Sequence, residues 1–560
     1  MRLAAAAVVL FVVLLAQTPA VVRYIDVGLD AGIIDKVYCG GERTKNYIVE
    51  TLGTGAAFID YDNDDDLDLF VVNASRLEGF PPGREPTNHL YRNDGAGKFK
   101  DVTSEAGLLK SGWGQGVCAG DIDNDGFTDL FVTYWGHDVL YRNTGKGSFE
   151  DVTEAAGMSG GEVNWGTGCA FTDFNRDGKV DLFVANYVQF DQKNTPRPGM
   201  PNACKWKDMT VMCGPRGLKG GVNKLWRNDS KPGSVKFTDV SEISKITAPG
   251  PRYSLSVTTL DYDHDGWPDL YVAVDSQASM LYRNNQNGTF TDTGVEAGVA
   301  LSEDGREQAG MGTTAGDYDG DGRVDLAKTN FIDDTPNVYR NNGDGGFTEM
   351  TGEAGLGSVT RFLGWGIAFV DYDNDTWPDL FLVNGHVYPD AADGFNQRRL
   401  LFRNLGNRRF QDVSTSSGDG VTAKHSSRGL AAGDYDNDGD VDLVVTNMND
   451  RPSLLRNEGG NRGHFLNVRL AGTKSNRSAI GARVKAVVGD RILVNEVRSG
   501  STFMSQSDLR LHFGLDRAKS VDRLEIQWPS GATETILNVG ADAFITVVEG
   551  KGLSPAKRRR

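Results

Sequence analysis

Seven short loops of alternating carboxylates are the part of this chain best suited to chemistry. The loops share the pattern D-x-[DN]-x-D-G-x-x-D-L, with Gly at position 6 in five of the seven, and each leads directly into an apolar stretch. In the second copy, Asp121, Asp123, Asp125 and Asp129 stand at positions 1, 3, 5 and 9. A loop that curls around a point turns alternate side chains inward, and Gly at position 6 allows the tight bend. Because Ca²⁺ takes about six to eight oxygen ligands, these side chains and the backbone carbonyl of position 7 predict a calcium site.

The predicted ligand set is the same in all seven loops: side chains at positions 1, 3, 5 and 9 and a carbonyl at position 7. In chain order these residues are Asp60, Asp62, Asp64, Asp66, Asp68, Asp121, Asp123, Asp125, Phe127, Asp129, Asp173, Asn175, Asp177, Lys179, Asp181, Asp261, Asp263, Asp265, Trp267, Asp269, Asp317, Asp319, Asp321, Arg323, Asp325, Asp371, Asp373, Asp375, Trp377, Asp379, Asp434, Asp436, Asp438, Asp440 and Asp442. Simple turn formation is the alternative, because Asp, Asn and Gly favour turns. Seven copies with one ligand spacing argue against it. We expect up to seven structural Ca²⁺ ions, since every ligand is a hard oxygen.

Three loops depart from the pattern. Position 6 is Asp65 in the first loop and Thr376 in the sixth, and the third loop has Asn175 and Lys179 at positions 3 and 7. We expect weaker or differently shaped sites there. The loops resemble EF-hand calcium loops over six positions, but a strand follows, and Val132 stands where an EF-hand has a bidentate Glu. A strand–loop–strand calcium site is therefore predicted.

Two further motifs recur with the loops and indicate the elements that position them. Leu-Tyr-Arg-Asn, as in 140–143, follows each loop, and Phe-x-Asp-Val-Thr, as in 149–153, comes next in most units. Each unit thus predicts four short strands, which is typical of a propeller blade. The strand at 24–27 precedes the first loop, and the seventh unit lacks its own last strand. We expect this N-terminal strand to complete the seventh blade, which would close the ring and remove an exposed edge.

The seven arginines of the Leu-Tyr-Arg-Asn motif have two interpretations. They could form a ring that binds a polyanion, or each could be an ion pair or cap at the end of its strand. We favour the second interpretation, because a repeated architecture alone places an Arg there seven times.

The fold class predicted from these patterns is all-β: a seven-bladed β-propeller with calcium-binding Asp loops, followed by a small C-terminal β domain. In chain order the predicted parts are a signal peptide (1–20), the propeller (21–460) with an insertion at about 189–221, the C-terminal β domain (461–550) and a basic tail (551–560). An uncleaved anchor is the alternative for the first part, although its apolar run is short for the about 20 residues that a span needs. We expect no membrane span after signal removal.

Charge and composition exclude some functions. The chain of 560 residues carries a net charge of −17, which argues against nucleic acid as a partner. The liganding side chains of the seven Asp loops, less Asn175, supply 27 carboxylates, and seven bound Ca²⁺ would add +14 and leave a net charge of about −3.

The five cysteines are odd in number, so at least one is free or pairs with another chain. Cys204 and Cys213 lie together in the insertion and are the best candidates for a disulfide, whereas the pairing of Cys39, Cys118 and Cys169 stays open.

Long loops in compact folds are usually functional or disordered. The insertion is accordingly the preferred region for ligand contact, with mere decoration as the alternative.

The Asp loops resemble those of FG-GAP/VCBS repeats, the family that includes the integrin α-subunit propeller, over about residues 50–457. The C-terminal block, with Gly481-Ala-Arg-Val484, Ser505-Gln506 and Trp528-Pro-Ser-Gly531, resembles an ASPIC/UnbV domain. Together with a signal peptide, these parts resemble the cartilage acidic protein family. The resemblance implies a secreted, calcium-binding propeller concerned with matrix or surface interaction, and it implies no agreed molecular activity.

The leading functional hypothesis is a secreted or otherwise extracytoplasmic protein, at the cell surface or in the periplasm, that binds an extracellular protein or polysaccharide. Many loops on a rigid ring suit such binding. The alternatives are an extracytoplasmic enzyme acting on polysaccharide or lipid, since propellers host such activities, and a structural spacer in a surface complex. No catalytic residue is assigned and no cofactor other than Ca²⁺ is expected. His386, which follows the sixth loop, is the one histidine that the enzymatic hypothesis would use.

Overall fold

A computed structural model describes residues 22–159 and 163–554. The predicted signal peptide and the end of the basic tail lie outside these residues. Within them, no helix is long and apolar enough to cross a membrane. The helical segments that the described residues form are short: α1 (Gly28–Ala31), α2 (Asp419–Thr422) and the 3-10 turns η1 (Ile48–Glu50), η2 (Ser414–Ser416) and η3 (Gly460–Arg462).

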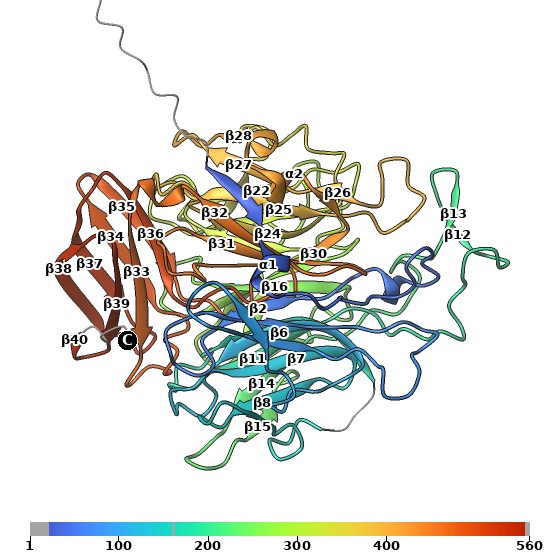
Figure 1. Ribbon diagram of the computed structural model, residues 1–560, viewed down its shortest axis with the longest axis horizontal. Coiled ribbons are helices and arrows are strands. Elements are labelled where there is room, and N and C mark those ends of the chain that lie inside the picture. Colours follow the sequence, from blue (N-terminus) through green and yellow to red (C-terminus); the bar gives the residue numbers. More distant parts are fainter. Residues whose placement is uncertain (1–21, 160–162, 555–560) are drawn as a thin grey trace, which may run out of the picture.

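The described residues form the seven four-stranded antiparallel blades of a propeller, as predicted, and blades 2 and 3 are paired with each other into one eight-stranded sheet (Figure 1). Blade 1 contains β2 (Ala56–Ile59), β3 (Asp68–Val71), β4 (His89–Asn93) and β5 (Phe99–Asp101); blade 2 contains β6 (Trp113–Gly120), β7 (Asp129–Gly136), β8 (Val139–Asn143) and β9 (Phe149–Asp151); blade 3 contains β10 (Asn164–Thr172), β11 (Asp181–Asn186), β14 (Lys224–Asn228) and β15 (Phe237–Asp239). Blade 4 contains β16 (Ser254–Leu260), β17 (Asp269–Val274), β18 (Met280–Asn284) and β19 (Phe290–Asp292); blade 5 contains β20 (Thr313–Gly316), β21 (Asp325–Lys328), β22 (Asn337–Asn341) and β23 (Phe347–Glu349); blade 6 contains β24 (Gly364–Val370), β25 (Asp379–Asn384), β27 (Leu400–Asn404) and β28 (Phe410–Asp412).

The ring is closed in the way that the sequence predicts. Blade 7 contains β30 (Ser427–Gly433), β31 (Asp442–Asn447), β32 (Ser453–Glu458) and, as its outer strand, the N-terminal β1 (Arg23–Asp26). β1 pairs antiparallel with β32, and Tyr24 stands opposite Asn457. The second strand of each blade lies between two neighbours of its own sheet and two adjacent blades. Every residue of β3 and of β31 is therefore buried.

The C-terminal block consists of two four-stranded sheets packed against one side of the ring (Figure 1). One sheet has the order β36 (Leu511–Asp516), β33 (His464–Ala471), β39 (Ala543–Val548), β40 (Gly552–Leu553), and the other has the order β35 (Arg491–Glu496), β34 (Arg483–Val488), β37 (Ser520–Gln527), β38 (Thr533–Gly540). Its apolar core, which includes Val484, Leu524 and Trp528, is continuous with Phe131 and Phe171 of blades 2 and 3.

A segment between β35 and β36, residues 499–507, enters the axis of the ring, and we name it the plug. Its backbone carbonyls at Thr502, Met504 and Gln506 accept hydrogen bonds from Thr313, Val117 and Phe58 of three different blades, at 3.0–3.1 Å.

The neighbouring inner strands need small residues to admit the plug. A side chain on Gly55 would have its Cβ only 1.6 Å from the Met504 carbonyl oxygen. The small residues of the innermost strands are thus explained by what fills the axis.

Candidate functional site: the Asp loops and the opposite face

Each Asp loop is shaped by hydrogen bonds to its own carboxylates. In the second loop, Asp121 accepts the backbone N–H of Asp125 at 3.1 Å and that of Gly126 at 2.7 Å. The N–H of Phe127 donates to Asp125 at 2.9 Å. The position-7 N–H donates to the position-5 carboxylate in all seven loops. Positions 1 and 5 are therefore held in place by the backbone that they fold.

The position-9 carboxylate connects the loop to the blade. Asp129 is fully buried, and it accepts the N–H of Ile122 at 2.8 Å and that of Asn143 at 2.6 Å. The same pair of bonds, from position 2 and from the Asn of the Leu-Tyr-Arg-Asn strand, occurs in every loop.

Carboxylate oxygens converge at the centres of the loops. Ligand oxygens of positions 1, 3 and 9 lie within 4.8 Å of one another in the first, second and fifth loops, as do those of positions 1, 3 and 5 in the fourth. The position-3 carboxylate has a buried oxygen without a hydrogen-bond partner wherever it is an Asp. These residues are Asp62, Asp123, Asp263, Asp319, Asp373 and Asp436. Such an oxygen is costly unless a cation meets it, so the donor set fits a calcium ion.

Burial also raises the pKa of these carboxyls. The pKa of Asp121 and that of Asp317 rise to about 7, chiefly through burial and further through the acids beside them. The pKa of Asp68 rises to about 9 for the same leading reason. A metal-free loop therefore holds protons near neutral pH, and a divalent cation would replace them.

Five of the seven motif arginines form local ion pairs among the described residues, as the interpretation favoured from the sequence expects. Three of them pair with position 3 of their own loop; these pairs are Arg142–Asp123 at 2.6 Å, Arg283–Asp263 at 2.8 Å and Arg403–Asp373 at 2.8 Å. Arg227 and Arg456 instead pair with an acid two residues later, Asp229 and Glu458.

The asparagine of the same motif has a role that the sequence analysis missed. Asn143 Nδ2 donates to the Tyr61 carbonyl of the preceding blade at 2.7 Å and to its own Thr128 carbonyl at 3.1 Å. The corresponding residues bridge each blade to the one before it; they are Asn93, Asn228, Asn284, Asn341, Asn404 and Asn457. The signal was present in the sequence, because Asn follows Arg in all seven copies.

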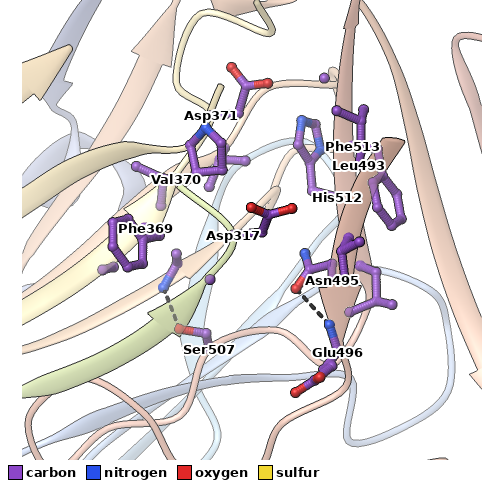
Figure 2. Close-up of a pocket in the computed structure, with 18 of the residues that line it drawn as sticks. Asp317, Phe369, Val370, Asp371, Leu493, Asn495, Glu496, Ser507, His512 and Phe513 are labelled. Carbon is purple, nitrogen blue, oxygen red and sulfur yellow. Dashed lines mark hydrogen bonds between the residues drawn. The ribbon is translucent and has the colours of Figure 1, made fainter. Parts of the chain in front are cut away.

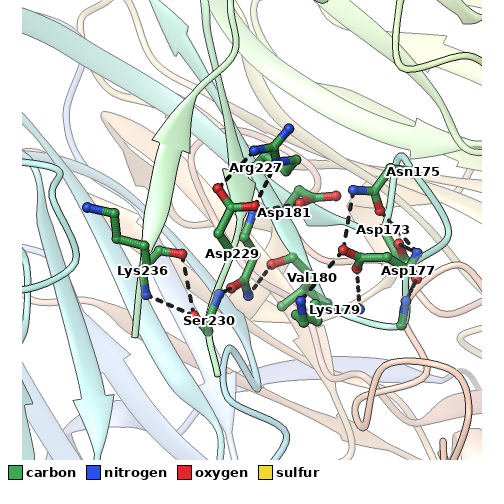
Figure 3. A network of polar contacts seen from close by, with 12 residues as sticks. Asp173, Asn175, Asp177, Lys179, Val180, Asp181, Arg227, Asp229, Ser230 and Lys236 are labelled. Carbon is green, nitrogen blue, oxygen red and sulfur yellow. Dashed lines mark hydrogen bonds and ion pairs between the residues drawn. The ribbon is translucent and has the colours of Figure 1, made fainter. Parts of the chain in front are cut away.

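The three atypical loops differ from one another. In the third loop, Lys179 lies 3.7 Å from Asp177, and Asn175 also donates to Asp177 (Figure 3). Its own charges thus offset part of the loop's acid. In the sixth loop, Thr376 has φ 79° and donates its N–H to Asp371 at 2.8 Å, as a Gly would. The missing glycine therefore leaves the shape of this loop unchanged.

The first loop is bonded to the C-terminal block instead. Arg469 of β33 donates to Asp60 at 2.7 Å and lies 3.3 Å from Asp65. The side chain of Asp65 thus serves an ion pair between the two parts of the chain.

The C-terminal block covers the face of the ring that carries the Asp loops, which we name the Asp-loop face. Arg510 donates to the Asp434 carbonyl at 2.9 Å, and His512 Nε2 lies 2.7 Å from Asn374 Oδ1. A cavity of about 200 Å³ remains between them, with Asp317 and Asp371 on one side and His512 on the other (Figure 2). Burial lowers the pKa of His512 to about 4, so its imidazole is neutral.

The insertion projects from the opposite side of the ring, which we name the far face (Figure 1). A disulfide joins Cys204 and Cys213 around the hairpin of β12 (Cys204–Trp206) and β13 (Met209–Val211). In the described part of the chain, Cys118 and Cys169 form a second disulfide between blades 2 and 3, and Cys39 is free and buried.

Trp206 of the hairpin lies against blade 6. Its ring centroid is 5.1 Å from that of His386 and 5.4 Å from that of Tyr388. His386 is fully buried, its Nδ1 accepts the Tyr388 N–H, and burial lowers its pKa to about 4. An imidazole with a lowered pKa is a weak base, and burial keeps His386 from a bound substrate, so it is poorly placed to act as a general base. Beside the hairpin lies a cavity of about 660 Å³.

Comparison with known proteins agrees with this architecture. The FG-GAP-like repeat family matches residues 60–132, 121–184 and 261–327, and the ASPIC and UnbV family matches residues 472–554. Human cartilage acidic protein 1 is 30% identical over 531 residues, which cover 89% of this chain and 72% of that protein. Cartilage acidic protein 1 of Mus musculus is 24% identical over 372 residues, 65% of this chain, and the chain spans only 52% of its length.

Similarity to solved structures is weak. A structure of an Agrocybe aegerita lectin that recognises non-reducing terminal N-acetylglucosamine is 16% identical, with a TM-score of 0.36 over 64% of this chain and 82% of that chain. That score carries no argument about this protein. The repeats, the C-terminal block and the 30% identity to the human protein show instead that this chain belongs to the cartilage acidic protein family.

Proposed function

We propose that this protein is secreted, binds calcium through its Asp loops, and mediates extracellular adhesion by binding a protein or glycan on its far face. The observation that carries the proposal is the asymmetry of the ring. The C-terminal block covers the Asp-loop face and the plug fills the axis, whereas the far face has an open cavity of about 660 Å³ beside the insertion.

Calcium has a structural role in this proposal. The buried position-3 oxygens without partners and the raised pKa of the position-1 carboxyls both favour a bound divalent cation. Ca²⁺ supplies no reaction step here: it neutralises carboxylates that the fold has brought together. Extracellular calcium is abundant enough for sites of modest affinity.

An extracellular location agrees with the cysteines. Disulfides such as Cys204–Cys213 persist mainly in oxidising compartments. The predicted signal peptide and the membership of the cartilage acidic protein family support the same location.

The test is capture by the chain without its predicted signal peptide, residues 21–560. The immobilised protein is offered extracellular-matrix proteins and polysaccharides in calcium and then in chelator. We expect a partner that is retained in calcium, released by chelator and lost in Trp206→Ala. Leu537→Ala, which changes an exposed residue of β38 in the C-terminal block, is the control. Failure to retain any partner while the protein remains folded would contradict the proposal.

A further inference from the structure

The cavity on the far face has an unusual combination of walls. Trp206 of the insertion, Tyr187 of blade 3 and Tyr388 of blade 6 supply aromatic surface. Asp275 follows β17, the second strand of blade 4, and Glu349 is the last residue of β23 in blade 5. Aromatic rings and carboxylates together favour organic cations, because the ring faces and the acids both attract positive charge.

Acid exceeds base in this lining. Seven carboxylates face the cavity, against the guanidinium groups of Arg216 and Arg306. Lys207 at the rim and the buried Lys328 add two more positive charges. Three of the acids at the rim are already paired, with Lys207, Arg216 and Arg306.

Two acids lie deeper. Asp275 accepts the Tyr187 hydroxyl at 2.5 Å and the Ser276 hydroxyl at 2.8 Å. Glu349 Oε1 accepts from Asn337 at 2.8 Å, while its buried Oε2 has no hydrogen-bond partner among the described residues. With the three rim pairs set aside, four of the seven acids remain against the single ammonium of Lys328, so acid is still in excess.

The chain itself places an ammonium group on this wall. Lys207 Nζ lies 4.4 Å from the centroid of the Trp206 ring and 2.9 Å from Asp333. The Lys207 side chain is 52% exposed, so it can move into solvent. At this place an ammonium group can therefore contact an aromatic ring face and pair with a carboxylate at the same time.

We propose that this cavity binds an alkylammonium group of the kind carried by a lysyl side chain on an extracellular protein partner. The ammonium would replace Lys207 over Trp206 and donate to the inner carboxylates. Charge-assisted hydrogen bonds of this type are roughly twice as strong as neutral ones. A sugar is disfavoured because it would need the Trp206 face that Lys207 covers and would leave the excess negative charge unmatched. This inference rests on the proposed function for one premise, which is that a protein partner binds at the far face.

The first experiment uses small probes on the full calcium-loaded chain. Nα-acetyl-lysine methylamide, its neutral analogue Nα-acetyl-norleucine methylamide and N-acetylglucosamine are titrated by calorimetry at low and high salt. We expect the lysine probe to bind at least about tenfold more tightly than the norleucine probe, which corresponds to about 1.4 kcal/mol. Its affinity should fall with salt, because surface charges are screened. Equal affinity of the two amino-acid probes, or binding of the sugar alone, would overturn the proposal.

Variants make the test specific to the cavity. Glu349→Gln should lower the affinity of the lysine probe about tenfold, because it removes one negative charge. Asp490→Asn, in an exposed turn of the C-terminal block, should leave that affinity unchanged. Lys207→Met should strengthen binding several-fold, because it removes the competing ammonium and retains the length of the side chain. Lys146→Met, at an exposed turn of blade 2, is the matched control. A weaker affinity in Lys207→Met would contradict the proposal, since a merely structural role predicts loss and not gain.

Failure here and failure of the proposed function are distinguishable. If the lysine probe binds but no macromolecule is captured, the amine site stands and the adhesion function does not. If a partner is captured by Glu349→Gln as well as by the unchanged chain, adhesion stands and the amine site does not.

Discussion

At the scale of single residues, the repeated asparagine is as important to this ring as the carboxylates. Asn143 bonds to two buried carbonyls, one of them in the preceding blade, and its own N–H bonds to Asp129. A single amide thus connects a loop, a strand and a neighbouring blade. The motif arginine beside it is charged and more noticeable in the sequence, but it reaches only its own loop or strand.

Asn143→Ala should therefore destabilise the propeller. The change leaves the Tyr61 and Thr128 carbonyls without this donor, and each buried polar group left unpaired costs about 1–3 kcal/mol. We expect the free energy of unfolding in calcium to fall by about 2–4 kcal/mol, measured by urea denaturation. Asn287→Ala, at an exposed turn, should change it much less. A midpoint equal to that of the control would show that the bridge between blades contributes little.

At the scale of elements, the proposed calcium sites predict a competition between protons and the cation for the carboxylates of each Asp loop. Burial raises the pKa of Asp121 to about 7, above the ordinary value of about 4. In metal-free protein, this shift contributes stability that is complete below about pH 4 and is lost as the pH rises through about 7. Bound Ca²⁺ would compensate for that loss by neutralising the carboxylates.

The gain in melting temperature on adding calcium should therefore be small at pH 5 and larger at pH 7.5. The measurement is calorimetry of protein made metal-free by dialysis, with and without excess calcium. Magnesium is a useful control ion, because it demands near-ideal octahedral geometry and dehydrates reluctantly. Equal gains at the two pH values would contradict the assignment of the raised pKa to the ligands.

The plug is the element that joins the two parts of the chain. Phe503 is fully buried, and its ring centroid lies 4.9 Å from that of Trp365. Phe503→Ala should lower the free energy of unfolding by about 3–5 kcal/mol, as for other large-to-small core changes. It should also make residues 499–507 easier to cleave in limited proteolysis. Leu537→Ala, 64% exposed in β38, is the control, and equal cleavage of both variants would argue against a plug that holds the block.

The sequence predicts what is local and repeated. Strand, loop and strand follow one another within each unit, so the blades and the closure by Tyr24 could be derived from pattern alone. The plug could not, because the Gln506 N–H bonds to the Ala56 carbonyl across most of the length of the chain. The small residues of the innermost strands were the one sequence signal that is related to the plug. The pairing of Cys118 with Cys169 likewise needed the register of two blades.

At the scale of the whole molecule, the ring has one covered face and one open face. The C-terminal block meets the Asp loops through Arg469 and Arg510. The insertion lies on the other side, where Lys207 pairs with Asp333. The candidate metal sites and the candidate ligand cavity are thus on opposite sides of the propeller.

Metal analysis of the whole chain tests the assignment of the loops together. We expect close to seven calcium ions per chain by elemental analysis after dialysis against calcium, with the third loop, which holds Asn175 and Lys179, among the first to lose its ion. Asp319→Asn, which alters one loop, should lower the count by about one. Well under four ions per chain would refute a common ligand set for the seven loops.

The pairing of β1 with β32 also means that blade 7 can form only late in synthesis of the chain. Arg23 stands opposite Glu458, so the first strand waits for a partner made more than 400 residues later. At about 5–20 residues per second, that wait lasts roughly 20–90 s. During it the nascent chain is an open arc with a free strand at one end, the kind of edge that pairs with other chains. A message that stops before codon 453 therefore yields a chain that lacks β32, the partner of its first strand.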